Sequence, residues 1–424
     1  MRRWWCAFVL VGLAAAARAQ GPSADWRTIE TEHFRIHFPV PFESWALHAA
    51  AEVEAVHARV SALVGYAPPR KIEVVVSDPV ADANGEAVPF LDRPEVLLWT
   101  SPPESESSIG DYGDWMELVA THEIAHVAHL TRPRDRGPGF LARLSPAPFG
   151  PLALRSPRWV MEGYATLIEG ALTGSGRPHS VFRAMVLRQL GVEGKLPEYS
   201  ALDASDTWLG GSISYLVGSA FLEWLSAREG PDALPRLWRR MASASGTTFG
   251  GAFRAVFGDS PATLYDRFRA EQTAKALDEE KRVTEEGIAD GSLWERLRGG
   301  TLALSVSPDG ERLLARRDPS PSKSFLAIWA AEPPAPISPA SEAGYREEPP
   351  PRRILFRLPR ADGFSASDPR WMPDGKSVLF SRRGPDADGR LRWDLYRWDY
   401  AEGRVARLTR LADTGDADPA PNGA

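Results

Sequence analysis

Two histidines and a glutamate lie inside the apolar run Val119–Leu130, in the order His122-Glu123-x-x-His126. At 3.6 residues per turn, residues four apart share one face of a helix, so both imidazoles can converge on one metal ion. Glu123 then points at the open side of that metal, where a general base would act on bound water. The spacing therefore predicts a Zn²⁺ site with hydrolytic chemistry, on a helix over about residues 114–130.

A catalytic zinc site usually has three protein ligands and one water, so a third side chain is needed. His129 shares the helix face, but a metal held by the first two histidines lies about one turn further back. We therefore expect His129 to pack or to hydrogen-bond. The metzincin arrangement is excluded, because it needs Gly and His where this chain has His129 and Arg132.

A better third ligand follows in the stretch Pro157–Thr166. This stretch predicts a helix that begins at a proline and offers the carboxylate of Glu162 beside the small residue Gly163. We expect Glu162 to be the third ligand. Glu169, Asp203 and Asp206 are candidates for supporting the ligand histidines, although solvent exposure is the simpler expectation for each.

Taken together, His122-Glu123-x-x-His126 and Trp159-x-x-Glu162-Gly163-x-Ala165 resemble the gluzincins, specifically the peptidase MA-like domains of bacterial envelope proteins. The resemblance covers roughly residues 25–280. It implies a zinc-dependent peptidase with His122, His126 and Glu162 as ligands and Glu123 as general base. One departure is the Pro-, Gly- and Arg-rich loop 131–156, which is longer than in the zinc aminopeptidases.

A tyrosine is a further candidate within this resemblance. Tyr215 begins a stretch similar to the helix in which gluzincins often place a Tyr or His that hydrogen-bonds the oxyanion. The same stretch also fits a core aromatic residue on an amphipathic helix. Both interpretations of Tyr215 are open at this point.

The N-terminus has the features of a secretory signal peptide. A basic start, Met1-Arg2-Arg3, precedes an apolar run of about fourteen residues that is short for a membrane span, and Ala17-Arg18-Ala19 has the form of a cleavage site. We expect residues 1–19 to be removed, and export to the periplasm or the extracellular space. A membrane anchor is the alternative. The only cysteine, Cys6, lies in this segment, so the mature chain cannot depend on disulfides.

Composition and charge give few hints about partners. The hydrophobic fraction of 43% and the charged fraction of 25% are ordinary for globular proteins, and 424 residues suggest two to three domains. A net charge of −6 with a pI near 5.9 argues against nucleic acid or anionic lipid as a partner. No membrane span is expected after cleavage.

The metal motif is embedded in a predicted α+β, zincin-like catalytic domain with a mixed sheet and a helical half. Residues 20–156 predict strands at 33–38, 71–76 and 95–99, a helix at 42–63 and the metal-site helix. We expect 95–100 to be the edge strand beside the cleft and 83–85 to be a turn. His33, His37, His48 and His57 lack metal spacing and are expected to be surface or packing residues. Residues 157–285 predict the helical half, with a charged linker around 278–290.

From 286 onward the pattern changes to short strands with a repeated Pro-Asp-Gly turn, at 308–310 and 373–375. A third copy would begin near 418–423. The repeats resemble a TolB-like β-propeller, all-β in class, of which about two blades are present in 286–424 whereas closure takes at least four. Such a chain resembles a truncated protein or a fragment.

These features predict an exported zinc metallopeptidase that acts on a peptide or protein substrate, with endopeptidase action favoured over exopeptidase action. Two alternatives remain. The chain could be a non-catalytic scaffold that binds an envelope protein through the propeller, or a zinc hydrolase of a non-peptide amide.

Overall fold

The structure is a computed structural model, and it describes residues 24–104, 107–109, 111–135, 149–204, 211–243, 247–287, 293–320, 323–333, 349, 351–359, 366–386, 389–410 and 412–423. The predicted signal peptide with Cys6 and the middle of the loop 131–156, residues 136–148, lie outside these residues. The chain divides into two compact units, one mainly within 1–288 and one mainly within 289–424; the short segments 79–81 and 104–106 group with the second. Each unit is described by itself.

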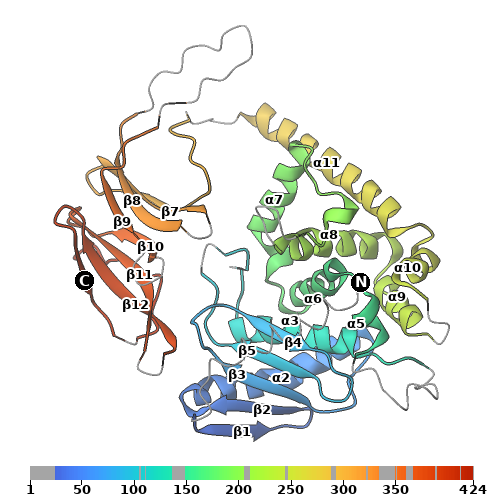
Figure 1. Ribbon diagram of the computed structural model, residues 1–424. Coiled ribbons are helices and arrows are strands. Elements are labelled where there is room, and N and C mark those ends of the chain that lie inside the picture. Colours follow the sequence, from blue (N-terminus) through green and yellow to red (C-terminus); the bar gives the residue numbers. More distant parts are fainter. Residues whose placement is uncertain are drawn as a thin grey trace, which may run out of the picture. The chain divides into compact units, whose positions relative to one another are not determined.

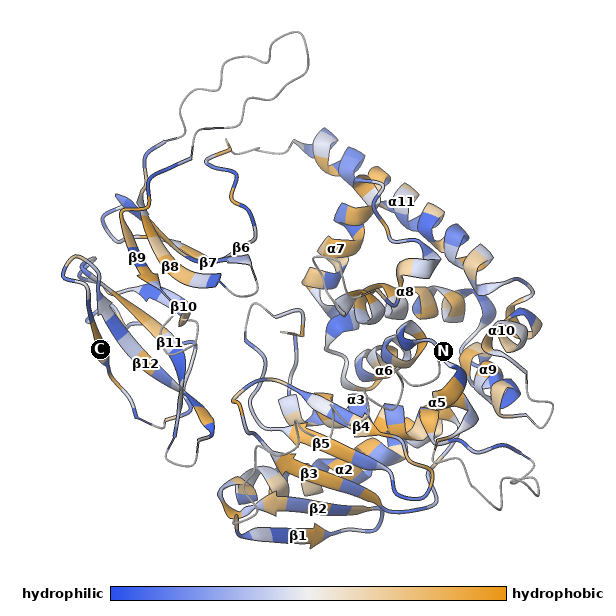
Figure 2. Ribbon diagram, in the orientation of Figure 1, coloured by the Kyte–Doolittle hydropathy of each residue, from blue (hydrophilic) through white to orange (hydrophobic). Residues whose placement is uncertain are grey.

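Unit 1 contains a five-stranded mixed sheet in the order β1-β2-β3-β5-β4. The three inner strands are parallel, and the two outer strands pair antiparallel to their neighbours. Figure 2 shows β3 and β5 as largely hydrophobic, as expected for strands in the interior of a sheet. The strands are β1 (Trp26–Glu30), β2 (Phe34–Pro39), β3 (Ile72–Ser77), β4 (Gly85–Val88) and β5 (Glu95–Trp99).

The edge of this sheet corrects one prediction. The strand at 95–99 is present as β5, but it is flanked by β3 and β4 and is not the edge. The edge strand on this side of the sheet is β4, which begins at Gly85, where a turn was expected. This strand could not be predicted from the sequence pattern, because it has only four residues and begins at the turn-forming pair Asn84-Gly85.

Two helices share a core with the sheet (Figure 1). Helix α2 (Glu43–Val64) presents buried alanines and valines at helical spacing and ends before Gly65, which has a positive φ of 74°. Helix α3 (Trp115–Leu130) begins at Asp114, whose carboxylate accepts a hydrogen bond from the Glu117 backbone N–H. Nearly every side chain of α3 is buried, so it is a core helix.

The rest of unit 1 is helical, as predicted for 157–285 (green to yellow in Figure 1). The last helix continues to Glu286, through most of the stretch expected to be a linker. The helices are α5 (Pro151–Arg155), α6 (Arg158–Thr173), α7 (Val181–Val192), α8 (Ser212–Glu229), α9 (Ala233–Ala242), α10 (Phe249–Phe257) and α11 (Pro261–Glu286), with short 3-10 turns η2 (Val40–Phe42), η3 (Arg177–His179) and η4 (Tyr199–Ala201).

Unit 2 contains two four-stranded antiparallel sheets, each with its strands in chain order. The two Pro-Asp-Gly turns join the first two strands of each sheet, and Asp309 and Asp374 accept backbone hydrogen bonds there. Their assignment as propeller blades stays a prediction. The strands are β6 (Gly300–Val306), β7 (Arg312–Ser320), β8 (Lys323–Ala330) and β9 (Phe356–Pro359), then β10 (Ala366–Trp371), β11 (Ser377–Pro385), β12 (Leu391–Asp399) and β13 (Arg404–Arg407).

Among the described residues, no helix combines the length and the hydropathy needed to cross a membrane.

Candidate metal centre

Helix α3 carries two of the predicted ligands and the predicted base. His122 and His126 lie one turn apart, with ring centroids separated by 4.9 Å. His122, His126 and Glu123 are all buried, with exposed fractions of 8% or less. Because both ends of α3 are fixed in the core, the backbone that carries the motif is held rigidly.

The third predicted ligand comes from α6. Glu162 Oε2 lies 3.2 Å from His126 Nε2 and 3.7 Å from His122 Nε2. One ligand atom from each of the three residues lies within 4.8 Å of the other two. Tetrahedral zinc with bonds of about 2.0–2.1 Å places its ligand atoms about 3.3 Å apart, so this two-histidine, one-glutamate set fits zinc.

Two glycines explain how Glu162 reaches this position. A Cβ on Gly163 would lie 2.7 Å from the backbone carbon of Gly218 on α8, and a Cβ on Gly218 would lie 2.6 Å from the carbonyl oxygen of Trp159 on α6. Side chains at either position would therefore push α6 and α8 apart. The close crossing brings Glu162 on α6 and Tyr215 on α8 to the same cavity.

Charge interactions favour ionised groups at the centre. Burial acts to lower the pKa of His122, but its contacts with the carboxylates of Glu162 and Glu169 outweigh burial and raise it to about 9. Burial acts to raise the pKa of Glu162, yet the histidines His126 and His122 lower it well below its usual range. The centre therefore holds a carboxylate that is ready to neutralise positive charge. Burial also raises the pKa of Glu123.

Glu169 supports His122 from behind. Its Oε2 lies 2.8 Å from His122 Nδ1 and accepts a hydrogen bond from Arg177 Nη1 at 2.8 Å. Its Oε1 accepts a hydrogen bond from the Arg177 backbone N–H at 2.9 Å. Glu169 is fully buried, so the expectation of solvent exposure was wrong. A carboxylate in this position fixes the ring orientation of a ligand histidine and raises its basicity.

The other supporting candidates do not join the centre. Asp203 is exposed and accepts a hydrogen bond from the backbone N–H of Trp159 at 2.6 Å, at the start of α6. Asp206 lies outside the described residues. His129 is buried between Tyr164 and Trp238, with ring centroids at 4.8 and 4.3 Å, and is absent from the ligand group of the described residues.

Tyr215 lies beside the metal centre. Its ring is nearly parallel to that of His122 at 5.9 Å, and the guanidinium groups of Arg177 and Arg158 lie 4.7 and 5.4 Å from its centroid. Burial and the nearby carboxylate of Glu162 raise the pKa of Tyr215 to about 12. The hydroxyl group therefore keeps its proton and can donate a hydrogen bond into the cavity.

The cavity over the centre has a volume of about 430 Å³. Strand β4 forms one side and the C-terminal part of α3, with α5 and α6, the other. Leu154, 64% exposed, reaches its mouth. The lining residues are Gly85, Glu86, Ala87, Pro89, His122, Glu123, His126, Leu130, Phe149, Ala153, Leu154, Met161, Glu162 and Tyr215.

Gly85 fits tightly against the predicted base. A Cβ at this position would lie 2.6 Å from Glu123 Oε1 and 2.6 Å from Val119 Cγ2. Only glycine allows the β4 backbone to lie this close to the Glu123 carboxylate. Sequence reasoning missed this contact.

The solved structures compared below are remote from this chain in sequence. No protein-family model matches the sequence, and no curated protein matches it. Among solved structures, native yeast LTA4 hydrolase is similar at 11% identity and a TM-score of 0.35, over 57% of this chain and 37% of that chain. An aminopeptidase N family protein from Idiomarina loihiensis is similar at 10% identity and a TM-score of 0.34, over 91% and 69%.

A third match is the Kuenenia stuttgartiensis hydrazine synthase, at 19% identity and a TM-score of 0.19, over 28% of this chain and 34% of that chain. The chain thus spans little more than a third of the hydrazine synthase and LTA4 hydrolase chains. At such low TM-scores, the chemistry has to be judged from the side chains of the site itself.

Two supporting residues were missed or misjudged from the sequence. Glu169 lies seven residues after Glu162, a spacing that returns to the same helix face, so its direction was available from the sequence. Arg177 follows α6 in the short turn η3, and no sequence pattern identifies it.

Proposed function

We propose that this chain is a zinc-dependent hydrolase that cleaves peptide bonds. The observation that carries the proposal is the convergence of His122, His126 and Glu162 beside the buried carboxylate of Glu123, in one cavity. A purely structural metal site would have no need of a general base.

The ligand set fits zinc, and bound zinc would polarise the scissile carbonyl group and lower the pKa of a water molecule. The remaining chemistry belongs to the chain. Glu123 accepts the proton of the attacking water and delivers it to the leaving amine. Its raised pKa, caused by burial, suits a group that has to hold that proton between the two transfers.

Tyr215 and Glu169 have separate tasks in this scheme. The protonated Tyr215 hydroxyl donates a hydrogen bond to the substrate oxygen as negative charge develops there. Glu169, neutralised by Arg177, keeps the His122 ring in its ligand orientation.

The substrate is an extended peptide that binds beside β4. In the described sheet β4 pairs on one side only, with β5, so its other edge can pair with a peptide backbone. The zinc aminopeptidases bind a free N-terminus through a Gly-x-Met-Glu-Asn motif, whereas β4 and the following residue read Gly85-Glu86-Ala87-Val88-Pro89. This difference favours endopeptidase action.

Three further parts of the proposal rest on sequence features. The signal-peptide pattern supports export to the periplasm or the extracellular space. The two four-stranded sheets of unit 2 agree in strand order with two blades of a TolB-like propeller, which could bind an envelope protein. Acidic net charge supports the absence of a nucleic-acid partner.

The decisive experiment compares Glu123→Gln with Glu162→Ala in casein cleavage and in zinc content. Glu123→Gln should keep zinc, but its rate of hydrolysis should fall by about 10²–10⁴-fold, because the amide keeps the shape of the carboxylate but cannot accept a proton. Glu162→Ala should lose the zinc ion bound at this centre, and His129→Ala should keep it.

Cleavage at half the wild-type rate by Glu123→Gln would contradict the mechanism. A wild-type protein that binds zinc but cleaves no peptide, and instead hydrolyses small amides, would reject the peptidase assignment while keeping the zinc-hydrolase chemistry.

A further inference from the structure

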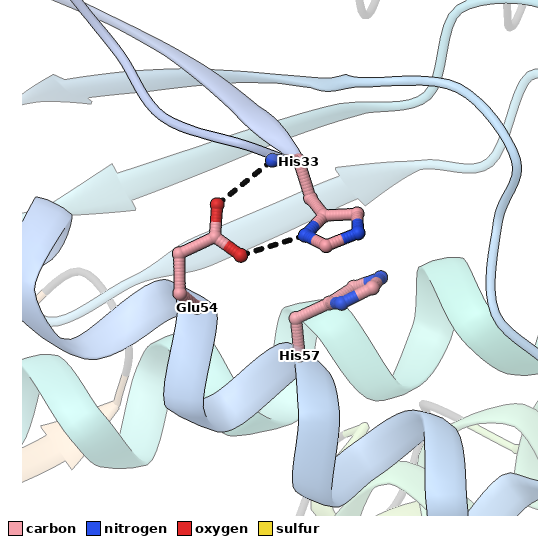
Figure 3. A group of neighbouring side chains, drawn as sticks. All are labelled: His33, Glu54 and His57. Atoms are coloured by element: carbon pink, nitrogen blue, oxygen red, sulfur yellow. Dashed lines mark hydrogen bonds and ion pairs between the residues drawn. The ribbon is translucent and has the colours of Figure 1, made fainter.

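A second group of metal-type side chains lies in unit 1, away from the cavity described above. His33 precedes β2, and Glu54 and His57 lie one turn apart on α2. Figure 3 shows that the fold brings all three together between the start of the strand and the helix. One ligand atom from each lies within 4.8 Å of the other two. None of them lines the catalytic cavity.

Hydrogen bonds hold two of these residues in place. The Glu54 carboxylate accepts from Thr31 Oγ1 at 2.6 Å and from the His33 backbone N–H at 2.8 Å, and its Oε2 lies 2.7 Å from His33 Nδ1. The side chains of His33 and Glu54 are 39% and 31% exposed, so an ion in solution can reach them.

His57 is the unexplained member of the group. It is 5% exposed, and its ring stacks on that of His33 with a centroid separation of 4.4 Å and an angle of 24°. Its buried Nε2 has no hydrogen-bond partner among the described residues. Buried polar atoms in proteins normally have a partner, so this nitrogen points to a missing one.

We propose that His33, Glu54 and His57 form a second metal site, for a divalent transition-metal ion such as Zn²⁺. Two imidazoles with one carboxylate are ligands that zinc and copper accept readily. The ion takes the place of the proton shared by His33 and Glu54, and that proton leaves to solvent. Burial, together with the neighbouring His33, lowers the pKa of His57, which keeps its ring in the neutral form that binds metal.

The site ties the start of β2 to the middle of α2. An ion that binds only the folded chain stabilises it by mass action, so the role of this site is structural. It has no residue in common with the proposed catalytic centre, and the two can be tested separately.

His37 provides a matched control. It lies on β2, and its Nε2 is 2.9 Å from Glu73 Oε2, so it forms a histidine–glutamate pair like that of His33. Unlike His33, His37 does not belong to a group of three metal-binding side chains among the described residues.

The experiment measures zinc stoichiometry and affinity by calorimetry and metal analysis on the full chain. Wild type and His37→Phe should bind two equivalents of Zn²⁺, and His57→Phe should bind one. Because His57 is a direct ligand in this proposal, its loss should weaken zinc binding at the second site by more than the roughly 10–100-fold that is typical of residues that only support a ligand. Glu54→Gln keeps the carbonyl oxygen but loses the charge, so it should also weaken zinc binding at the second site. This variant tests the proposal if His57→Phe does not fold.

A His126→Ala chain separates this proposal from the catalytic one. It should keep one equivalent of Zn²⁺, and zinc should still raise its thermal midpoint by several degrees, an effect that His57→Phe abolishes in the same background. Unchanged stoichiometry and affinity in both His57→Phe and Glu54→Gln would overturn the second site. So would an equal loss in His37→Phe, which would indicate unspecific binding to surface histidines.

Discussion

Tyr215 is the residue whose role in the site depends most on its protonation. Its raised pKa keeps the hydroxyl protonated, and the two guanidinium groups over its ring fix its position. In the proposed mechanism Tyr215 donates a hydrogen bond to the oxyanion, so we expect Tyr215→Phe to lower kcat by about 10²–10³-fold, with little change in KM or zinc content. Tyr199→Phe, outside the cavity, is the control. Wild-type kcat in Tyr215→Phe would identify Tyr215 as a packing residue.

His129 makes stability depend on pH. Burial lowers its pKa well below 6.5, so the folded chain keeps it neutral while the unfolded chain protonates it near its usual value. Because the unfolded state then binds more protons, the free energy of unfolding decreases as pH falls below about 6.5, by at most about 1.4 kcal/mol per pH unit. We expect His129→Leu to reduce this slope in urea unfolding between pH 7 and pH 5.5. Val127→Ala, which removes no titratable group from the same helix, should leave the slope unchanged.

At the scale of elements, the position of β4 against α3 decides whether Glu123 is placed correctly. We expect Gly85→Ala to keep zinc and the fold but to lose activity, because the added methyl group has to displace β4 or the Glu123 carboxylate. A displacement of about 1 Å at a catalytic group costs about 10²-fold in rate. Gly113→Ala, where a Cβ meets nothing within 4 Å, is the matched control. Equal activity of both variants would show that β4 does not constrain the base.

The same elements show how far sequence patterns reach. Helix α2 could be predicted because its apolar residues recur at helical spacing, and α3 because its apolar run is too long for a strand and contains the one-turn histidine pair. Strand β4 could not be predicted, because it has only four residues after a turn and so shows no clear alternation of apolar and polar residues. Likewise the two candidate ligand histidines could be predicted from their local spacing on one helix. The burial of Glu169 depends on Arg177, which only the folded chain brings into contact.

Long-range pairing also explains why His33 and His57 seemed unrelated in the sequence. Their spacing of twenty-four residues matches no local metal motif, and only the packing of α2 against the sheet brings the two rings together. Neither histidine lies in a motif, so motif analysis could not pair them.

At the scale of the whole molecule, the two units differ in how well their backbones are protected. Unit 1 encloses α3 in an extensive core, whereas the buried clusters of unit 2 are smaller and β13 is exposed at all four residues. In the described sheets the terminal strands β6, β9, β10 and β13 pair on one side only, and β9 and β13, with four residues each, are the shortest of them. Strands with an open edge and little buried surface exchange their amide hydrogens through small, frequent openings.

We therefore expect hydrogen exchange to be fastest in β9 and β13, intermediate in β7, β8, β11 and β12, and slowest in α3. The intermediate strands hold Leu326, Phe380 and Trp398, which belong to one buried cluster that links the two sheets. Hydrogen exchange read out by mass spectrometry, with peptides from 300–410 compared with those from 115–130, measures this order. If β13 were as protected as α3, its open edge would have to be covered in solution, by a second copy of the chain or by additional strands of a propeller.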